Sequence, residues 1–200
     1  MPEYRIYTPS AEGYRIFAEN LKKTEIEGLK KEEEFLKDFE NNPKNTDMET
    51  VRNRVKKLNQ FYRTRISNDE LREIENIILR PGFDAKLDND GYGLVEELRR
   101  VPSKRTESGF RDHLSFASKY CYHCRPNRYP IYDSINVHVL SVYLGYEGKR
   151  DYSKYVECFK KFCSFLGFCK LKGNEGYYID KYIQAIGTHS ELLFRGTGEK

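Results

Sequence analysis

The stretch SFASKYCYHCRPNRYPIYDS, residues 115–134, joins two apolar segments through a short run rich in proline and arginine. The first segment is expected to form a helix, and RPNR at residues 125–128 ends it. Pro130 biases the residue before it toward an extended backbone. Asp133 stands directly before SINVHVLSVYL, where an aspartate accepts the free amide hydrogens of a first helical turn. The stretch therefore predicts a helix, an extended turn and a second helix capped by Asp133.

Helical periodicity continues on both sides of this stretch. Ser10 is suited to cap a helix through Leu21, and capping boxes start at Thr46 and Ser67. No run of alternating apolar and polar residues favours a sheet, and residues 101–112 are expected to form a polar loop. We expect a compact all-α domain of about eight helices. Further helices are predicted at residues 24–40, from Gly93 to residue 100, and at 113–124, 134–145, 152–167 and 178–187.

The chain length of 200 residues suits one domain with a hydrophobic core. The Asn-Asn-Pro sequence at residues 41–43 interrupts the helical pattern. We therefore expect an N-terminal helical extension over residues 1–45, a helical core domain over residues 46–187 and a flexible tail over residues 188–200.

Composition limits the cellular setting and the partners. No stretch of eighteen apolar residues is present and the N-terminus has no secretory pattern, so a cytoplasmic protein without membrane association is expected. The overall charge is +4, but residues 1–49 carry −4, residues 50–130 carry +6 and residues 131–200 carry +2. A basic middle segment is compatible with a phosphate-backbone partner, although it is also typical of a solvated surface.

The five cysteines predict reduced thiols and no metal site. Cys121, His123 and Cys124 form a C-x-H-C cluster near a helix end, but no second pair of ligands with zinc-site spacing follows. Cys163 falls on the apolar stripe of its helix, which favours a core position. Phosphate-binding and hydrolase motifs are absent, His113, His138 and His189 lie in no recognisable motif, and no cofactor is expected.

The order of helix, proline-containing extended turn and helix-opening aspartate resembles the helix-hairpin-helix DNA glycosylases. PIYD at residues 130–133 stands where that family has P-V-D, and Ala117 matches the small residue of its G-x-K-x-A-D helix. Residues 58–79 resemble the two helices at the start of that fold. The resemblance covers about residues 50–145 and implies a helical scaffold that binds DNA, with RNA as an open alternative.

Three family features are missing. The glycine-rich L-P-G-V-G hairpin is replaced by residues 103–112, in which Gly109 is the only glycine. Ser115 occupies the position of the Schiff-base lysine found in strand-cleaving members, although Lys119 lies one turn later on the same helix face. The C-x6-C-x2-C-x5-C iron–sulfur spacing of some glycosylases is absent too.

The resemblance implies residue roles. Asp133 would be the catalytic carboxylate of a monofunctional DNA glycosylase in DNA repair, with Lys119 as an auxiliary group, because cleavage of an N-glycosidic bond builds positive charge on the sugar. Tyr62, Tyr129 and Tyr132 would line a pocket for a flipped base. A non-enzymatic protein-interaction or defence-system module on the same helical scaffold is the alternative. The expected nucleic-acid contacts are Lys104, Arg105, Arg111, Arg125 and Arg128, and together with Lys119 they are expected to form one positive surface beside Asp133.

Overall fold

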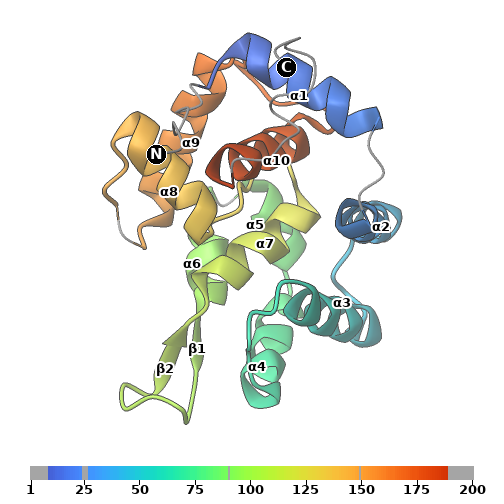
Figure 1. Ribbon diagram of the computed structural model, residues 1–200. Helices are drawn as coiled ribbons and strands as arrows, with labels where there is room; N and C mark the ends of the chain where they lie inside the picture. Colours follow the sequence, from blue (N-terminus) through green and yellow to red (C-terminus); the bar gives the residue numbers. More distant parts are fainter. Residues whose placement is uncertain (1–8, 24–26, 90, 149, 189–200) are drawn as a thin grey trace.

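The computed structural model describes residues 9–23, 27–89, 91–148 and 150–188. Within these ranges the chain forms ten helices and one two-stranded sheet, which confirms the predicted all-α class (Figure 1). The elements are α1 (Ala11–Lys23), α2 (Glu27–Asn41), α3 (Met48–Phe61), α4 (Asn68–Ile78), α5 (Phe83–Asn89), α6 (Gly93–Arg99), β1 (Arg100–Pro102), β2 (Phe110–Asp112), α7 (Leu114–Cys124), α8 (Ser134–Leu144), α9 (Tyr152–Phe165) and α10 (Glu175–Gly187).

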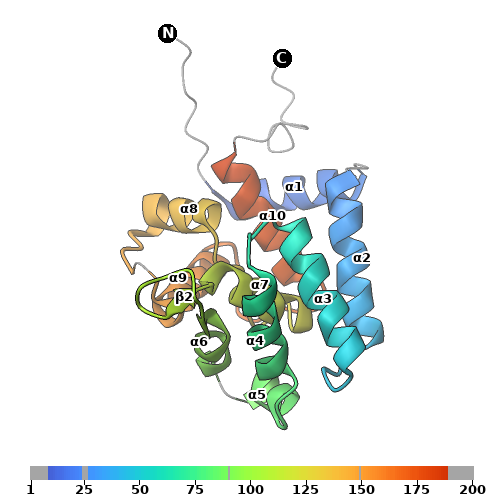
Figure 2. The ribbon, with the colours of Figure 1, turned by 90° about the horizontal axis from the view of Figure 1, so that it is seen from below.

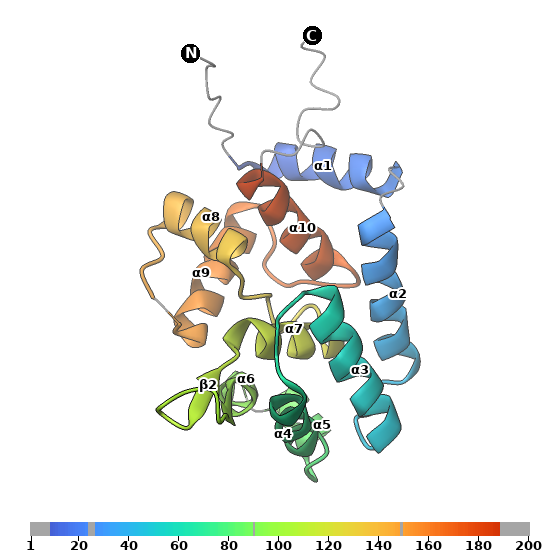
Figure 3. The same ribbon diagram turned by 60° about the horizontal axis from the view of Figure 1, so that its bottom comes forward.

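Helix α7 is the central element of the fold. It lies between α3 to α6 on one side and α8 to α10 on the other (Figure 3). Nine of its eleven residues are buried, because helices pack around its whole circumference. Its principal neighbours are α6, α2 and α3. Residues 115–134 thus include most of the helix on which the domain is assembled.

Side-chain caps stabilise the first turns of α3, α4 and α8. The Ser67 side chain accepts from the Glu70 amide while the Glu70 carboxylate accepts from the Ser67 amide, so this capping box is confirmed. Asp133 caps α8 as predicted, accepting from the Asn136 amide at 2.9 Å. At α3 the cap is Asp47 rather than Thr46, because the Asp47 carboxylate accepts from the Thr50 amide at 2.6 Å.

Two short elements were not predicted. Residues 101–112 form a β-hairpin instead of a polar loop, with Val101 paired to Arg111, and the hairpin extends away from the helical body (Figure 1). Each strand has three residues, and only Val101 is buried among these six strand residues. The strands are therefore too short to show an alternating pattern of apolar and polar residues in the sequence. Helix α5 has seven residues and follows directly on the Pro81-Gly82 turn. Such a helix is too short to show a 3.6-residue period clearly.

The N-terminal helices contribute to the same hydrophobic core as the rest of the chain. Phe17 and Leu21 of α1 are buried in this core, and so is Phe39 of α2. α1 lies across α10, where the rings of Phe17 and Tyr182 are 5.5 Å apart (Figure 3). α2 runs alongside α3, as Figure 2 shows. Within the described ranges, no helix has both the length and the apolar composition needed to cross a bilayer.

Candidate functional site

The segment between α7 and α8 is held extended by buried side chains. Tyr152 of α9 donates its hydroxyl to the Pro130 carbonyl at 2.8 Å. The Asn136 side-chain amide donates to the Ile131 carbonyl at 3.0 Å, and the Tyr132 amide donates to Ser118 Oγ at 3.0 Å. Since the backbone groups before Asp133 are tied to α7, α8 and α9, the position of Asp133 is fixed by the surrounding helices.

Asp133 and Lys119, the two residues predicted to be catalytic, lie together. Asp133 Oδ1 accepts the Asn136 amide hydrogen, and Asp133 Oδ2 is 3.9 Å from Lys119 Nζ. The side chain of Asp133 is 18% exposed and that of Lys119 is 7% exposed, so this is a largely desolvated ion pair. Such pairing of a buried amine with a carboxylate is found both in structural ion pairs and in active sites.

The Lys119 amine occupies the space beside Ser115. Lys119 Nζ donates to Ser115 Oγ at 2.7 Å and lies 4.8 Å from the centre of the Tyr62 ring. Burial lowers the pKa of Lys119, while the negative charge of Asp133 acts in the opposite direction. The amine therefore releases its proton more readily than a solvated lysine does.

Behind Tyr62 the polar contacts continue into the interior. The Tyr62 hydroxyl lies 2.9 Å from Glu32 Oε1 and 3.0 Å from His123 Nε2. Glu32 is paired with Lys181 at 2.7 Å, and both side chains are more than nine-tenths buried. Burial by itself raises the pKa of Glu32, but the charge and hydrogen bond of Lys181 lower it overall. Glu32 is thus ionised inside the protein.

Asp180 connects this interior pair to the start of α8. Its Oδ1 accepts from the Asn136 side-chain amide at 2.7 Å, and its Oδ2 is 3.2 Å from Lys181 Nζ. Burial raises the pKa of Asp180 to about 6, with Lys181 opposing the shift. Asn136 thereby touches both Asp133, through its backbone amide, and Asp180, through its side chain. We call the connected set the buried ionic cluster: Glu32, Tyr62, Lys119, His123, Asp133, Asn136, Asp180 and Lys181.

The three predicted pocket tyrosines take different positions. Tyr62 belongs to the buried ionic cluster, and Tyr132 directly precedes Asp133 and accepts the Arg150 amide on its hydroxyl at 3.0 Å. Tyr129 is fully buried, and its hydroxyl donates to the Leu87 carbonyl at 3.0 Å. The expectation that Tyr129 lines a base pocket is therefore wrong, because its ring is packed in the hydrophobic core.

The predicted nucleic-acid contacts fall into two groups at opposite ends of α7. Lys104 and Arg105 are exposed on the hairpin loop, and Arg111 lies on β2 with an ion pair to buried Glu70 at 3.6 Å. Arg125 and Arg128 follow the far end of α7, and Arg125 pairs with Asp88 at 2.7 Å. An eleven-residue helix separates the groups by about 16 Å. With Lys119 buried as well, the expected single positive surface beside Asp133 is not formed.

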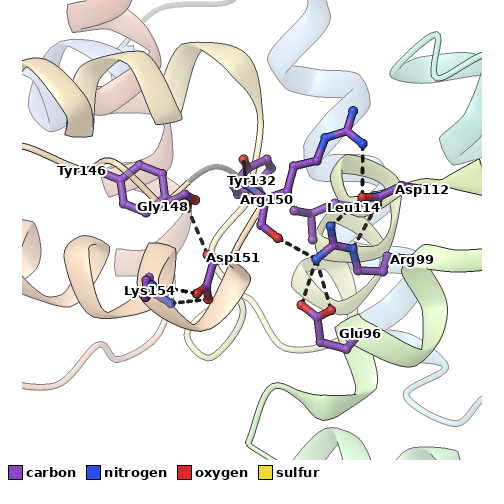
Figure 4. Close-up of polar contacts among 10 residues, drawn as sticks. All are labelled: Glu96, Arg99, Asp112, Leu114, Tyr132, Tyr146, Gly148, Arg150, Asp151 and Lys154. Carbon is purple, nitrogen blue, oxygen red and sulfur yellow. Dashed lines mark hydrogen bonds and ion pairs between the residues drawn. The ribbon is translucent and has the colours of Figure 1, made fainter.

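A buried arginine connects the hairpin to the turn before Asp133 (Figure 4). Arg99, at the end of α6, donates to both carboxylate oxygens of Asp112, at 3.0 and 2.5 Å, and to the Arg150 carbonyl at 2.7 Å. The Arg150 amide in turn donates to the Tyr132 hydroxyl at 3.0 Å. Asp112 also accepts the Leu114 amide at 3.1 Å, at the start of α7. This chain of contacts fixes the base of the hairpin relative to the Tyr132–Asp133 segment.

The C-x-H-C cluster is built into the core. Cys121 and His123 are buried, all five cysteines are free thiols, and burial raises the pKa of Cys124 to about 12. His123 Nδ1 has no hydrogen-bond partner within the described ranges. Among those residues, no three His, Cys, Asp or Glu side chains are arranged to hold a metal ion. His113 is buried 3.8 Å from Glu70, His138 is exposed, and His189 lies outside the described residues.

Sequence reasoning missed Glu32, Asp180 and Lys181. Glu32 lies four residues before Leu36 and seven before Phe39, so it shares the apolar face of α2. A charged residue at a core-facing position was the available signal. Asp180 and Lys181 are adjacent charges inside the otherwise apolar YYIDKYIQAI segment of α10, which is a similar signal.

The fold and its buried polar contacts define an all-α domain with an ionic cluster centred on α7. Residues 15–128 match the model of the HI_0787_N family, which is described as an N-terminal domain. Because the match spans more than half of the chain, the protein belongs to the HI_0787_N family. No curated protein and no solved structure matches the chain. The family match includes Tyr62, Lys119 and His123 and ends before Asp133.

Proposed function

We propose that this protein binds nucleic acid and cleaves an N-glycosidic bond at the Asp133–Lys119 pair, as its resemblance to helix-hairpin-helix glycosylases implies. The single observation that carries the proposal is the 3.9 Å separation between Lys119 Nζ and Asp133 Oδ2 at a partly open edge of the buried ionic cluster. Lys119 belongs to α7 and Asp133 stands at the start of α8, and their side chains meet there. Paired ionisable groups of this kind concentrate at active sites.

The chemistry assigned to Asp133 is electrostatic. As the bond between the base and C1′ lengthens, positive charge develops on the sugar, and an ionised carboxylate in a desolvated site stabilises it. Asp133 also accepts a proton from a water molecule whose oxygen forms the new bond to C1′. That proton then passes to the departing base, so the products are a free base and an abasic sugar.

Lys119 is assigned a supporting role. Its ammonium group balances the Asp133 charge in the resting protein, and burial lowers its pKa, which favours release of a proton. The Ser115 hydroxyl fixes the amine through the 2.7 Å hydrogen bond. In strand-cleaving relatives of the resembled fold the lysine stands at the position of Ser115, and here the amine of Lys119 reaches the same place.

The nucleic-acid surface is assigned to the hairpin. Its loop and strands present Lys104 and Arg105 together with Phe110, whose side chain is exposed and lies 5.9 Å from the Arg100 guanidinium. Exposed cations beside an exposed aromatic ring suit a phosphate backbone with unstacked bases. The Arg99 contacts hold this hairpin in a fixed relation to the segment that ends at Asp133.

The test is base release from oligonucleotides that contain uracil, 8-oxoguanine, hypoxanthine or 3-methyladenine. The natural protein is compared with Asp133→Asn and with Asp151→Asn as the matched control, since Asp151 caps α9 in the same way without a buried lysine. We expect Asp133→Asn to lower the rate of release by at least about a hundredfold, and Asp151→Asn to leave it unchanged. Equal release by all three proteins would place the chemistry elsewhere.

A non-enzymatic binding or protein-interaction module, such as a component of a defence system, is the second candidate. The observation that favours it is that the N-cap hydrogen bond and the Lys119 contact already account for Asp133, whose side chain is only 18% exposed. In that case no base is released from any of the four oligonucleotides by the natural protein. Salt-dependent binding of the same oligonucleotides then separates a nucleic-acid module from a protein-interaction module.

A further inference from the structure

A cavity of about 510 Å³ lies between the RPNR turn, α9 and the loop that follows α9. This volume is within the usual range for sites that bind small molecules. Neither Asp133 nor Lys119 lines it, although Pro130 of the extended segment does. The cavity is therefore separate from the site of the proposed glycosidic chemistry.

The charged side chains around the cavity have one sign. Arg128, Lys160 and Lys170 line it, and no Asp or Glu is among its lining residues, all of which are described by the structure. No ion pair joins these three cations to a carboxylate within the described ranges. Arg128 Nε is buried and has no hydrogen-bond partner there, so it is an unused donor. Arg128 and Lys160 lie over the rings of Tyr129 and Tyr92, at 5.8 and 5.5 Å from the ring centres. Three cations without a carboxylate partner around one cavity favour a multiply charged anion, and phosphate suits the guanidinium geometry.

Apolar side chains line much of the rest of the wall, which also includes Asn127 and Ser164. Val156 and Phe159 of α9 form one side, and Phe168 and Leu171 of the following loop form another. The cavity adjoins a second one that includes Tyr92, through lining residues that both share, among them Arg128 and Lys160. Aromatic and aliphatic walls next to a cationic rim suit a ligand with a planar ring attached to a phosphate.

The side of the cavity formed by the RPNR turn is fixed by contacts that do not depend on a ligand. The Asn127 side chain donates to the Gly173 carbonyl at 2.7 Å and accepts the Gly176 amide at 3.0 Å. A Cβ atom at Gly176 would lie 2.6 Å from the Pro126 carbonyl oxygen, so only glycine permits this close approach of α10 to the RPNR turn. This side of the cavity is thus preorganised, which lowers the entropic cost of binding.

We propose that this cavity binds a small phosphorylated molecule with a planar ring, of the mononucleotide class. The phosphate contacts Arg128, Lys160 and Lys170, and the ring packs between Phe159 and Phe168. The site is independent of the proposed glycosidic chemistry, because it shares none of the residues of the buried ionic cluster.

The experiment is titration of the full chain with 5′-AMP, 5′-UMP and phenyl phosphate, followed by calorimetry and by amide chemical shifts. We expect at least one of these probes to bind with a Kd below about 1 mM, with shifts centred on residues 126–130 and 168–171. Adenosine and inorganic phosphate are each expected to bind at least about tenfold more weakly than that probe, because adenosine has no phosphate group and inorganic phosphate has no ring.

Three variants locate the binding. Arg128→Gln is expected to weaken binding about tenfold through loss of a charge-assisted contact, whereas Lys161→Gln serves as the control because Lys161 is exposed and does not line the cavity. Ser164→Trp, at an exposed lining position, is expected to block binding without a change of charge. Thermal unfolding of each variant verifies that the fold is retained.

The outcomes separate the two proposals. Asp133→Asn is expected to bind the probes as the natural protein does, whatever its effect on base release. Absence of binding by all three probes, or binding that survives both Arg128→Gln and Ser164→Trp in folded protein, would overturn the assignment of this cavity.

Discussion

Lys119 of α7 and Asp133 at the start of α8 face each other across the extended turn, with Lys119 Nζ 3.9 Å from Asp133 Oδ2. The same carboxylate caps α8 through the Asn136 amide. Asp133 therefore has a local role, which any helix cap performs, and a tertiary role, which depends on a buried amine. The two roles separate experimentally because Asp151 has the first without the second.

Replacement of Asp133 by asparagine is expected to cost more stability than the same change at Asp151. Asparagine caps nearly as well as aspartate, so Asp151→Asn is expected to lower the free energy of unfolding by less than about 1 kcal/mol. Asp133→Asn also leaves Lys119 buried without its carboxylate, and we expect a loss of about 2–3 kcal/mol. Urea denaturation of both variants measures the difference.

The double variant Asp133→Asn/Lys119→Met tests the cause of that loss. Removal of the amine relieves the unpaired buried charge, so we expect a coupling energy of about 1–2 kcal/mol between the two positions. Additive effects of the two single changes would mean that the 3.9 Å approach contributes nothing to stability.

Arg99 and Arg150 both bind Asp112, but their substitutions are expected to differ in effect. The Arg99 side chain is 9% exposed and also binds Glu96 and the Arg150 carbonyl, whereas the Arg150 side chain is 71% exposed (Figure 4). Arg99→Gln breaks several buried charged hydrogen bonds, and we expect a loss of about 2–4 kcal/mol. Arg150→Gln removes a solvated ion pair and is expected to cost less than about 1 kcal/mol. Equal losses measured by thermal or urea unfolding would contradict this account of the hairpin base.

The expected nucleic-acid contacts lie in two groups, one at each end of α7. Under the proposed function, the hairpin group binds nucleic acid and the group at the far end of α7 does not. We expect the double change of Lys104 and Arg105 to alanine to weaken binding of all sequences and to reduce the salt slope by about 2. The change of Arg125 alone to alanine, at the far end of α7 and outside the proposed phosphate contacts, is the control and is expected to leave the slope unaltered. Titrations of fluorescent DNA across a salt series measure both, and the reverse result would assign binding to the far end of α7.

The sequence predicted those parts of the fold that depend on contacts between residues close together in the chain. Pro130 disfavours a helical backbone before it, and Asp133 supplies the amide acceptor that α8 needs, so turn and cap were predicted together. The Ser67 capping box was predicted for the same reason, since both of its hydrogen bonds join residues three positions apart. Such contacts require no knowledge of which helix packs on which.

The parts that sequence did not predict depend on tertiary contacts. The hairpin has only one buried strand residue, Val101, and its position relies on the Arg99–Asp112 ion pair. Glu32 and Lys181 come from α2 and α10, and their pairing arises only when both helices pack on α7. The resemblance implies a base pocket lined by aromatic side chains near Asp133, Tyr129 among them, but the turn directs the Tyr129 ring into the core. Local pattern determines secondary structure here more fully than it determines which polar side chains become buried.

His123 is expected to weaken the fold in acid. Burial lowers its pKa to about 4, with Glu32 acting in the opposite direction, against an ordinary value of 6.5 for an exposed histidine. Between these two pH values the unfolded chain binds a proton at His123 and the folded protein does not. The stability contributed by the neutral ring is therefore present above pH 6.5 and is lost as the pH falls toward 4, by an amount on the order of 3 kcal/mol.

Asp180 titrates in the same range with the opposite sign. Its pKa is raised to about 6, so the folded protein binds more protons than the unfolded chain between this pH and the ordinary value of 3.8, and stability falls there as the pH rises. The wild-type profile alone therefore does not isolate His123. Subtraction of the profile of a His123→Gln variant does, because Asp180 is present in both proteins and its contribution largely cancels.

The measurement is urea denaturation of the wild type, His123→Gln and His138→Gln at pH 7, 5.5 and 4. At neutral pH His123→Gln is expected to be the less stable protein, since the 3.0 Å contact with Tyr62 is altered. The deficit is expected to shrink steadily as the pH falls, because only the wild type has a buried ring to protonate. His138 is exposed on α8, so its variant is expected to follow the wild type throughout. A His123→Gln profile parallel to that of the wild type would show that the ring is protonated equally in the folded and unfolded states.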